Sequence, residues 1–271
     1  TTQMETTNPQ IFNELLPAIK AHGVALWYTI GGSNRSQNMR EVFSDPALRS
    51  TFVDNAIAYA EQKGYQGIDI DWEFPTTESD ASAETATLCE LYAKAKPKGL
   101  GVSVDIPTHF HLQVHSTAVN NADYAQCVDM INVMAYDYYV NTCRQNDPVF
   151  EATRTMDYWL GRGLPANKLN MGIAFYGYDC FSDPRGPITW AGWSGVSLNY
   201  YNDFNGMNRV YIAEDPDRIQ KADYIASKQL AGVLYWEITH DVPLSDTGFP
   251  APNATIVTKR IAAWWDDELK A

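Results

Sequence analysis

The chain has 271 residues, of which 45% are hydrophobic and 13% aromatic. This length can bury a sizeable core and is close to that of a (β/α)8 barrel, so we expect a single domain over residues 1–271. The formal net charge of -13 repels phosphate backbones and anionic lipids, which excludes nucleic acid and membrane as expected partners. A neutral polymer such as a polysaccharide fits this surface better, and the aromatic rings could stack on it.

Helix and strand signals alternate along the chain and predict an α/β fold. Asp45 can cap a helix whose first residue is Pro46, and an apolar stripe that includes Leu48 and Phe52 continues as far as Gly64. The strands expected from apolar runs are residues 24–30, 64–75, 100–106, 128–139, 169–176 and 232–238. The helices expected between and around them are residues 11–22, 46–63, 79–96, 119–126 and 253–270, with two more that begin near residues 148 and 216. No run of about 18 apolar residues is present, so we expect no membrane span.

The stretch GYQGIDIDWEFP at residues 64–75 places three carboxylates on one face of a predicted strand. With a period of two residues, this acidic face carries Asp69, Asp71 and Glu73, and the opposite face carries Ile68, Ile70 and Trp72. The apolar face predicts burial under helices, as in a parallel sheet. The carboxylates would then point into a barrel or its mouth, where crowding lets one of them stay protonated near neutral pH as a general acid. The alternatives are a solvated acidic strand end and a cation site.

The segment GIDIDWEFP resembles the catalytic strand of the glycoside hydrolase family 18 chitinases, whose pattern is Asp, two residues, Asp, one residue, Asp, one residue, Glu. This resemblance implies a TIM-type (β/α)8 barrel with no metal or cofactor. It implies Glu73 as the general acid and base, Asp71 as the partner that shares its proton, and Asp69 as the supporting acid. Gln66 stands where the pattern has its first Asp.

Two further stretches resemble motifs of the same family. The TIGG stretch that ends in Gly31 and Gly32 is similar to the SxGG motif of the third barrel strand, where small residues let the loop pass close to the sugar. The stretch Met134 to Asp137, MAYD, is similar to the MxYD motif. The resemblance implies that Tyr136 orients the acetamido carbonyl of the sugar and that Met134 and Asp137 contribute to substrate binding.

The last two strands carry weaker matches. The resemblance assigns Tyr176 to the FYG that closes the seventh strand and Trp236 to the floor of the sugar site on the eighth. Trp190, Trp193, Tyr200 and Tyr201 are candidates for a substrate platform. The roughly 40 residues between Tyr176 and Pro216 are too few for the α+β subdomain that many members insert there. We therefore expect a shallow cleft and internal cuts.

The matched strands correspond to the third to eighth of the family barrel, and nothing before Pro9 supplies the first two. A closed eight-stranded barrel cannot be built from these strands alone, because strands three and eight would face each other unpaired. A truncated chain, a further segment or a second copy that completes the barrel, and a natural six-unit variant are the open alternatives.

The four cysteines at positions 89, 127, 143 and 180 allow three pairings. A disulfide between Cys143 and Cys180 is favoured, because both would lie in loops that follow neighbouring strands, and it would suit a secreted enzyme. The triplet Asn34-Arg35-Ser36 fits a glycosylation acceptor.

The sequence therefore predicts a retaining, chitinase-like hydrolase that acts on β-1,4-linked N-acetylglucosamine polymers by substrate-assisted catalysis. An endo-β-N-acetylglucosaminidase would use the same Glu73, Asp71 and Tyr136. A protein that binds chitin oligomers without cleaving them is the alternative from another class, which the missing strands and Gln66 favour and the presence of Glu73 disfavours.

Overall fold

The computed structural model describes residues 21, 23–109, 122–137, 148–174, 176–179, 186–189, 210–211 and 215–236. The chain divides into two compact units, residues 1–107 with 112–131 and residues 108–111 with 132–271. The predicted helix 253–270, nearly all of the predicted helix 11–22, the four platform aromatics, Cys143 and Cys180 lie outside the described residues.

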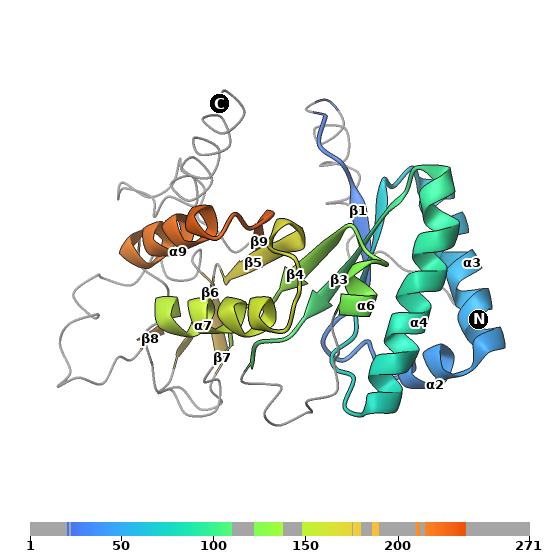
Figure 1. Ribbon diagram of the computed structural model, residues 1–271, viewed down its shortest axis with the longest axis horizontal. Coiled ribbons are helices and arrows are strands. Elements are labelled where there is room, and N and C mark those ends of the chain that lie inside the picture. The colour runs from blue at the N-terminus through green and yellow to red at the C-terminus, as the bar shows by residue number, and fades with distance from the viewer. Residues whose placement is uncertain are drawn as a thin grey trace. The chain divides into compact units, whose positions relative to one another are not determined.

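The first unit alternates parallel strands with helices. In chain order its elements are β1 (Trp27–Gly31), α2 (Met39–Ser44), α3 (Pro46–Lys63), β2 (Gly67–Asp71), α4 (Glu78–Ala95), the 3₁₀ turn η1 (Lys96–Lys98), β3 (Gly101–Ile106), α6 (Ala122–Ala125) and the start of β4 (Met130–Val133). Strands β1, β2 and β3 are adjacent in that order and parallel. Helices α3 and α4 pack side by side beside these strands (Figure 1).

Helix α3 has the ends that the sequence predicts. The Asp45 carboxylate accepts hydrogen bonds from the backbone N–H groups of Ala47 and Leu48, and Gly64 closes the helix at a φ of 73°. Phe52 is buried as expected, but Leu48 is 43% exposed, so its place in the buried stripe was predicted wrongly. Leu48 lies in the first turn, before the helix reaches the core.

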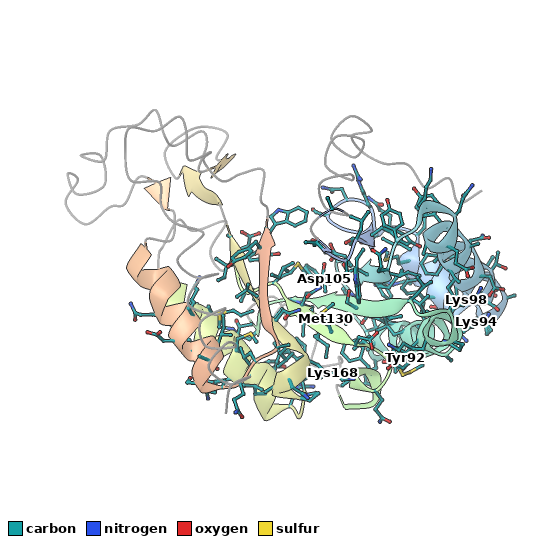
Figure 2. All side chains as sticks on the ribbon, turned by 90° about the horizontal axis from the view of Figure 1, so that it is seen from above. Tyr92, Lys94, Lys98, Asp105, Met130 and Lys168 are labelled. Carbon is teal, nitrogen blue, oxygen red and sulfur yellow. A yellow bond between two sulfur atoms is a disulfide. The ribbon has the colours of Figure 1, made fainter. Side chains whose placement is uncertain are left out.

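Ion pairs on the outer surface join α3 to the end of α4 and to η1. Lys94 Nζ lies 2.8 Å from Asp54 Oδ1, and Lys98 Nζ lies 2.8 Å from Glu61 Oε2. Figure 2 shows both lysines at the outer edge of the helical layer. Exposed pairs of this kind contribute little to stability, so the two helices are held mainly by their buried faces.

Asp80 joins α2 to the beginning of α4. Its two carboxylate oxygens accept hydrogen bonds of 2.8 Å from Arg40 Nε and Nη2, and the backbone N–H groups of Thr76 and Thr77 donate to Oδ2. The Asp80 N–H donates in return to Thr77 Oγ1, which completes a capping box. Burial by itself would raise the pKa of Asp80, but the hydrogen bonds from Arg40, Thr76 and Thr77 outweigh it and lower the pKa to about 2.

Asp80→Asn is expected to lower the free energy of unfolding at pH 7 by about 2 kcal/mol, because it removes a carboxylate whose pKa is depressed on folding. The folded pKa lies below the ordinary value, so this stabilisation is present above about pH 4 and is lost as the pH falls toward 2. Urea unfolding at pH 7 and at pH 3 measures it. The surface variant Asp54→Asn is the control, with an expected change of about 0.5 kcal/mol or less. If Asp80→Asn is as much less stable than the unmodified protein at pH 3 as at pH 7, the depressed pKa of Asp80 is not the source of the stabilisation.

A disulfide joins Cys89 on α4 to Cys127, which follows α6. If all four cysteines are paired, the favoured Cys143–Cys180 disulfide leaves Cys89 and Cys127 for each other, so the observed disulfide is compatible with that pairing. The favoured partners Cys143 and Cys180 lie outside the described residues.

The second unit contains parallel strands and a separate small sheet. Its elements are the end of β4, α7 (Pro148–Gly161), the 3₁₀ turn η2 (Ala166–Lys168), β5 (Leu169–Ala174), β6 (Tyr176–Asp179), β7 (Gly186–Thr189), β8 (Val210–Tyr211), α9 (Asp215–Ser227) and β9 (Gly232–Trp236). Strands β5 and β9 are parallel neighbours, and α7 packs against α9.

Three differences from the predicted elements lie in this unit. Strand β6 pairs in antiparallel fashion with β7 and β8, so the interval after Tyr176 holds a three-stranded sheet. The predicted strand 169–176 ends at Ala174. The predicted strand 128–139 ends at Val133. Beyond it the Ala135 N–H donates to the Val133 carbonyl, and a positive φ of 63° at Asp137 bends the backbone.

In the part of the chain that the structure describes, β1 has β2 as its one partner strand and β9 has β5. These are the strands matched to the third and eighth of the family barrel, the two that were predicted to lack a partner. Across the same residues, every helix is too short or too polar to cross a membrane.

Candidate active site

The acidic face of β2 is built in rows across the three strands of the first unit. Trp27, Gly67 and Gly101 share the first row, and a Cβ atom on either glycine would lie 2.0–2.3 Å from the Trp27 ring. The two glycines therefore leave the space that the indole occupies. The next row on the same face, two residues further along each strand, carries polar side chains, so the ring underlies the acidic part of the face.

Asp69 lies in this second row of the acidic face, between Thr29 of β1 and Ser103 of β3. Thr29 Oγ1 donates to Asp69 Oδ2 at 3.0 Å, and Ser103 Oγ donates to Oδ1 at 2.5 Å. Asp69 is only 5% exposed. The two hydroxyl donors fix this carboxylate and tie the three strands together at the level below the next acid.

Asp71 ends β2 and is buried, with an exposed fraction of 6%. Its Oδ1 atom has no hydrogen-bond partner within the described residues. Burial first, and then the charges of Glu73 and Asp69, raise the pKa of Asp71 to about 7. A buried carboxyl that titrates near neutrality and lies next to a second acid is typical of a site that shares a proton.

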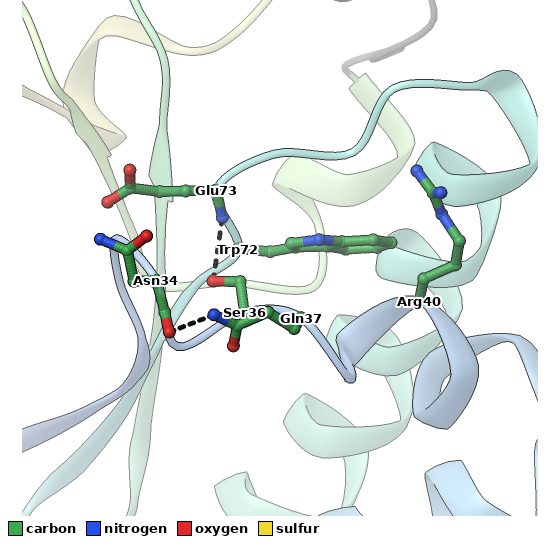
Figure 3. A pocket seen from close by; sticks show the side chains of 6 residues that line it. All are labelled: Asn34, Ser36, Gln37, Arg40, Trp72 and Glu73. Carbon is green, nitrogen blue, oxygen red and sulfur yellow. Dashed lines mark hydrogen bonds between the residues drawn. The ribbon is translucent and has the colours of Figure 1, made fainter.

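Glu73 lies two residues beyond the end of β2 and is half-buried. It lines a pocket of about 330 Å³ together with Trp72, Asn34, Ser36, Gln37 and Arg40. Figure 3 shows the side chains of Trp72 and Glu73 pointing in opposite directions from the backbone. The apolar face is covered, because the Trp72 ring packs edge-on against Phe43 of α2 with centroids 5.4 Å apart. The predicted alternation of acidic and apolar residues is therefore confirmed, but the strand itself runs only from Gly67 to Asp71 and not over residues 64–75 as predicted.

Gly31 and Gly32 lie against Asp71. The Gly32 N–H donates to the Asp71 carbonyl at 2.8 Å, and a Cβ on Gly31 would lie 2.0 Å from the same oxygen. Both glycines have positive φ angles, 116° and 92°. A larger residue at position 31 would push β1 away from the end of the acidic strand. Contact of these glycines with a sugar stays a prediction.

Gln66 lies at the opposite end of β2 from the carboxyl groups. Its Oε1 accepts from the Leu26 N–H at 2.6 Å, and its Nε2 donates to the Gly64 carbonyl at 3.0 Å. The side chain is exposed and holds the starts of β1 and β2 together. The residue at the first position of the acidic pattern therefore binds the backbone at the N-terminal ends of these strands, away from Asp71.

The other predicted site residues belong to the second unit. Tyr136 is half-buried and its ring lies over β5, because a Cβ on Gly172 would lie 2.8 Å from Tyr136 Cε1. Met134 and Asp137 flank it and are half-buried. Trp236 ends β9 opposite Ala174 and is 51% exposed. Tyr176 begins β6. Their roles toward a substrate stay predictions.

Ser36 and Glu84 are among the residues near the acidic face that were not singled out from the sequence. Ser36 contacts the backbone of the acidic segment and lacked any signal except the glycosylation triplet. Glu84 of α4 is 4% exposed, and burial, followed by the charges of Asp71 and Asp80, raises its pKa to about 8. Glu84 lies four residues before Leu88, on the buried stripe of its helix, and this spacing could have identified it.

In the described part of the chain, no group of three or more His, Cys, Asp or Glu side chains has a geometry that could hold a metal ion. The arrangement offers proton-transfer groups and hydrogen-bond donors: a half-buried Glu73 on a pocket, and beside it a buried carboxyl that titrates near pH 7.

The family model of the glycosyl hydrolases family 18 matches residues 2–241. Endochitinase 1 of Metarhizium robertsii is 25% identical over 260 residues, which cover 79% of this chain and 61% of the relative. Chitinase 1 of Aphanocladium album is 28% identical over 271 residues, which cover 81% and 62%. The chain thus spans about three fifths of the length of these curated relatives.

The fold resembles that of solved chitinase structures. Catalytic domain 2 of the Ostrinia furnacalis Group II chitinase superposes with a TM-score of 0.78 at 20% identity, covering 96% of this chain and 84% of that domain. A mutant of that domain was solved in complex with a chitooligosaccharide. The structure has the strand–helix repeats of part of a TIM-type (β/α)8 barrel. The chain belongs to the glycosyl hydrolases family 18.

Proposed function

We propose that this protein is a retaining, chitinase-like glycosidase that hydrolyses β-1,4-linked N-acetylglucosamine polymers, with endo action. The observation that carries the proposal is the pair formed by Glu73 on its pocket and the buried Asp71, whose pKa is raised to about 7. The family membership and the chitinase relatives support the substrate class.

Glu73 protonates the glycosidic oxygen of the leaving sugar while the acetamido oxygen of the bound sugar attacks C1. The C1–O bond breaks, and an oxazolinium ion forms. Glu73, now a carboxylate, then takes a proton from the water that opens this ion at C1, so the acid is regenerated. Only one protein acid is required, because the substrate supplies the nucleophile; this family lies outside the usual two-carboxylate scheme.

Asp71 stabilises the acetamido N–H in this scheme and shares a proton with Glu73. Asp69 supports Asp71 by its charge, and the hydroxyls of Thr29 and Ser103 fix Asp69. Tyr136 is assigned the orientation of the acetamido carbonyl, while Met134, Asp137, Tyr176, Trp236 and the glycines at 31 and 32 are assigned to sugar binding. These assignments follow the family motifs.

A secreted protein fits this function, because its polymeric substrate lies outside cells. The disulfide between Cys89 and Cys127 supports an oxidising compartment. Self-association or a further segment that completes the barrel is part of the proposal, since β1 and β9 each have one partner strand among the described residues.

Time-resolved product analysis of chitohexaose tests the proposed function. Early release of dimers and trimers is the expected result, because an endo enzyme cuts internal bonds. Cleavage of a high-mannose glycopeptide in place of chitohexaose would instead identify an endo-β-N-acetylglucosaminidase. Binding of chitohexaose without any product would identify a sugar-binding protein and overturn the hydrolase.

A further inference from the structure

Ser36 lies in the loop between β1 and α2 and is 6% exposed. Its hydroxyl oxygen accepts a hydrogen bond of 3.2 Å from the backbone N–H of Glu73. The same hydroxyl lies 3.1 Å from the carbonyl oxygen of Asp71 and 3.0 Å from that of Gly32, so it donates its one proton to either of them. Figure 3 shows the Ser36 side chain directed at the Glu73 nitrogen.

These contacts join the backbone of Asp71 to the backbone of Glu73, the residues immediately before and after Trp72. The regular pairing of β1 with β2 ends at the Gly31–Asp71 pair, so Glu73 lies beyond it. The Ser36 hydroxyl supplies a hydrogen-bond partner for the Glu73 N–H at this point, and the Gly32 N–H binds the Asp71 carbonyl. One loop thus fixes the backbone on either side of the turn between the two acids.

We propose that Ser36 is a positioning residue for the reaction, which sets the spacing of the Glu73 and Asp71 side chains through their backbone. This inference rests on the proposed function of Glu73 as the proton donor. A misplacement of a catalytic group by about 1 Å can lower a rate by roughly 100-fold, so a hydrogen bond that fixes this backbone has a direct effect on turnover.

Ser36→Ala is expected to lower kcat for chitohexaose by roughly 10- to 100-fold while KM changes by less than about twofold, because the loss concerns orientation and not sugar binding. Ser36→Thr restores a hydroxyl and is expected to recover most of the lost kcat. Ser33→Ala is the matched control: Ser33 lies in the same loop, is exposed, and accepts only from Asn34 Nδ2 at 3.3 Å within the described residues. Its kcat should equal that of the unmodified protein.

A readout that does not depend on turnover separates positioning from general stability. The pKa of the Asp71 carboxyl, followed by NMR of labelled carboxyl groups, should fall by about one unit in Ser36→Ala, since the two acids are less tightly held together. It should stay unchanged in Ser33→Ala. If the unmodified protein releases no product, the proposed hydrolase fails, and the pKa of Asp71 still decides the role of Ser36. An unchanged pKa of Asp71 in Ser36→Ala would overturn the positioning role. The role would also be overturned if Ser36→Thr unfolds at the same midpoint as the unmodified protein but does not recover the lost kcat.

Discussion

Glu73→Gln is expected to lower kcat for chitohexaose hydrolysis by about 1000-fold, because glutamine has nearly the same shape but cannot donate a proton to the leaving oxygen. Its affinity for the oligosaccharide should change by less than about threefold, since the amide keeps the hydrogen-bonding capacity of the side chain. Product analysis by chromatography measures the first quantity, and calorimetric titration of the inactive variant measures the second.

The control for this variant is Glu78→Gln, which changes an exposed acid in the first turn of α4. Its turnover should match that of the unmodified protein. Glu73 is half-buried on an open pocket, so the unfolding midpoint of Glu73→Gln should also be preserved. A variant that keeps its full rate would remove Glu73 from the chemistry and with it the proposed mechanism.

Asp71→Asn is expected to have two opposite effects. Turnover should fall at least about 100-fold, because the variant cannot exchange a proton with Glu73. The protein should nevertheless become more stable at pH 8 by roughly 2–4 kcal/mol, since the neutral amide replaces a carboxylate that is buried beside two other acids. The unpartnered Oδ1 atom and an exposed fraction of 6% are the features behind this expectation.

The dependence of this stabilisation on pH has a definite sign. The folded pKa of Asp71 is raised from 3.8 to about 7, so the folded state binds the proton more tightly than the unfolded state does. The unmodified protein therefore loses stability as the pH rises from about 4 to 7, and the advantage of Asp71→Asn should grow over that range and then level off. Urea unfolding at pH 4.5, 6 and 8 measures it, with Asp54→Asn as the control. A variant that is less stable than the unmodified protein at pH 8 would show that the carboxylate is favourably bound.

The part of the fold that the sequence predicts best is the part with strong local signals. Asp45, Pro46 and Gly64 define both ends of α3, because capping and left-handed glycine are local properties of the backbone. The acidic face of β2 follows in the same way from a period of two residues. The sequence also indicated a parallel α/β architecture, which the strand pairings within each unit confirm.

The remaining features depend on contacts between distant segments. Ser36 and Gln66 both hydrogen-bond to backbone groups from other parts of the chain, and no periodicity marks them. The end of β4 at Val133 is determined by turn hydrogen bonds in a stretch that is apolar enough to look like a longer strand. Local residue propensities cannot decide whether such a stretch forms turn hydrogen bonds or continues to pair as a strand.

Trp27, Gly67 and Gly101 come from three different strands and yet share one volume beneath the acids. Neither glycine can acquire a side chain while the indole stays in place, and the loss of the indole would leave an unfilled space beside both glycines. The three positions are therefore expected to change together during evolution. Relatives that carry a larger residue at either glycine position should carry a smaller one in place of the tryptophan.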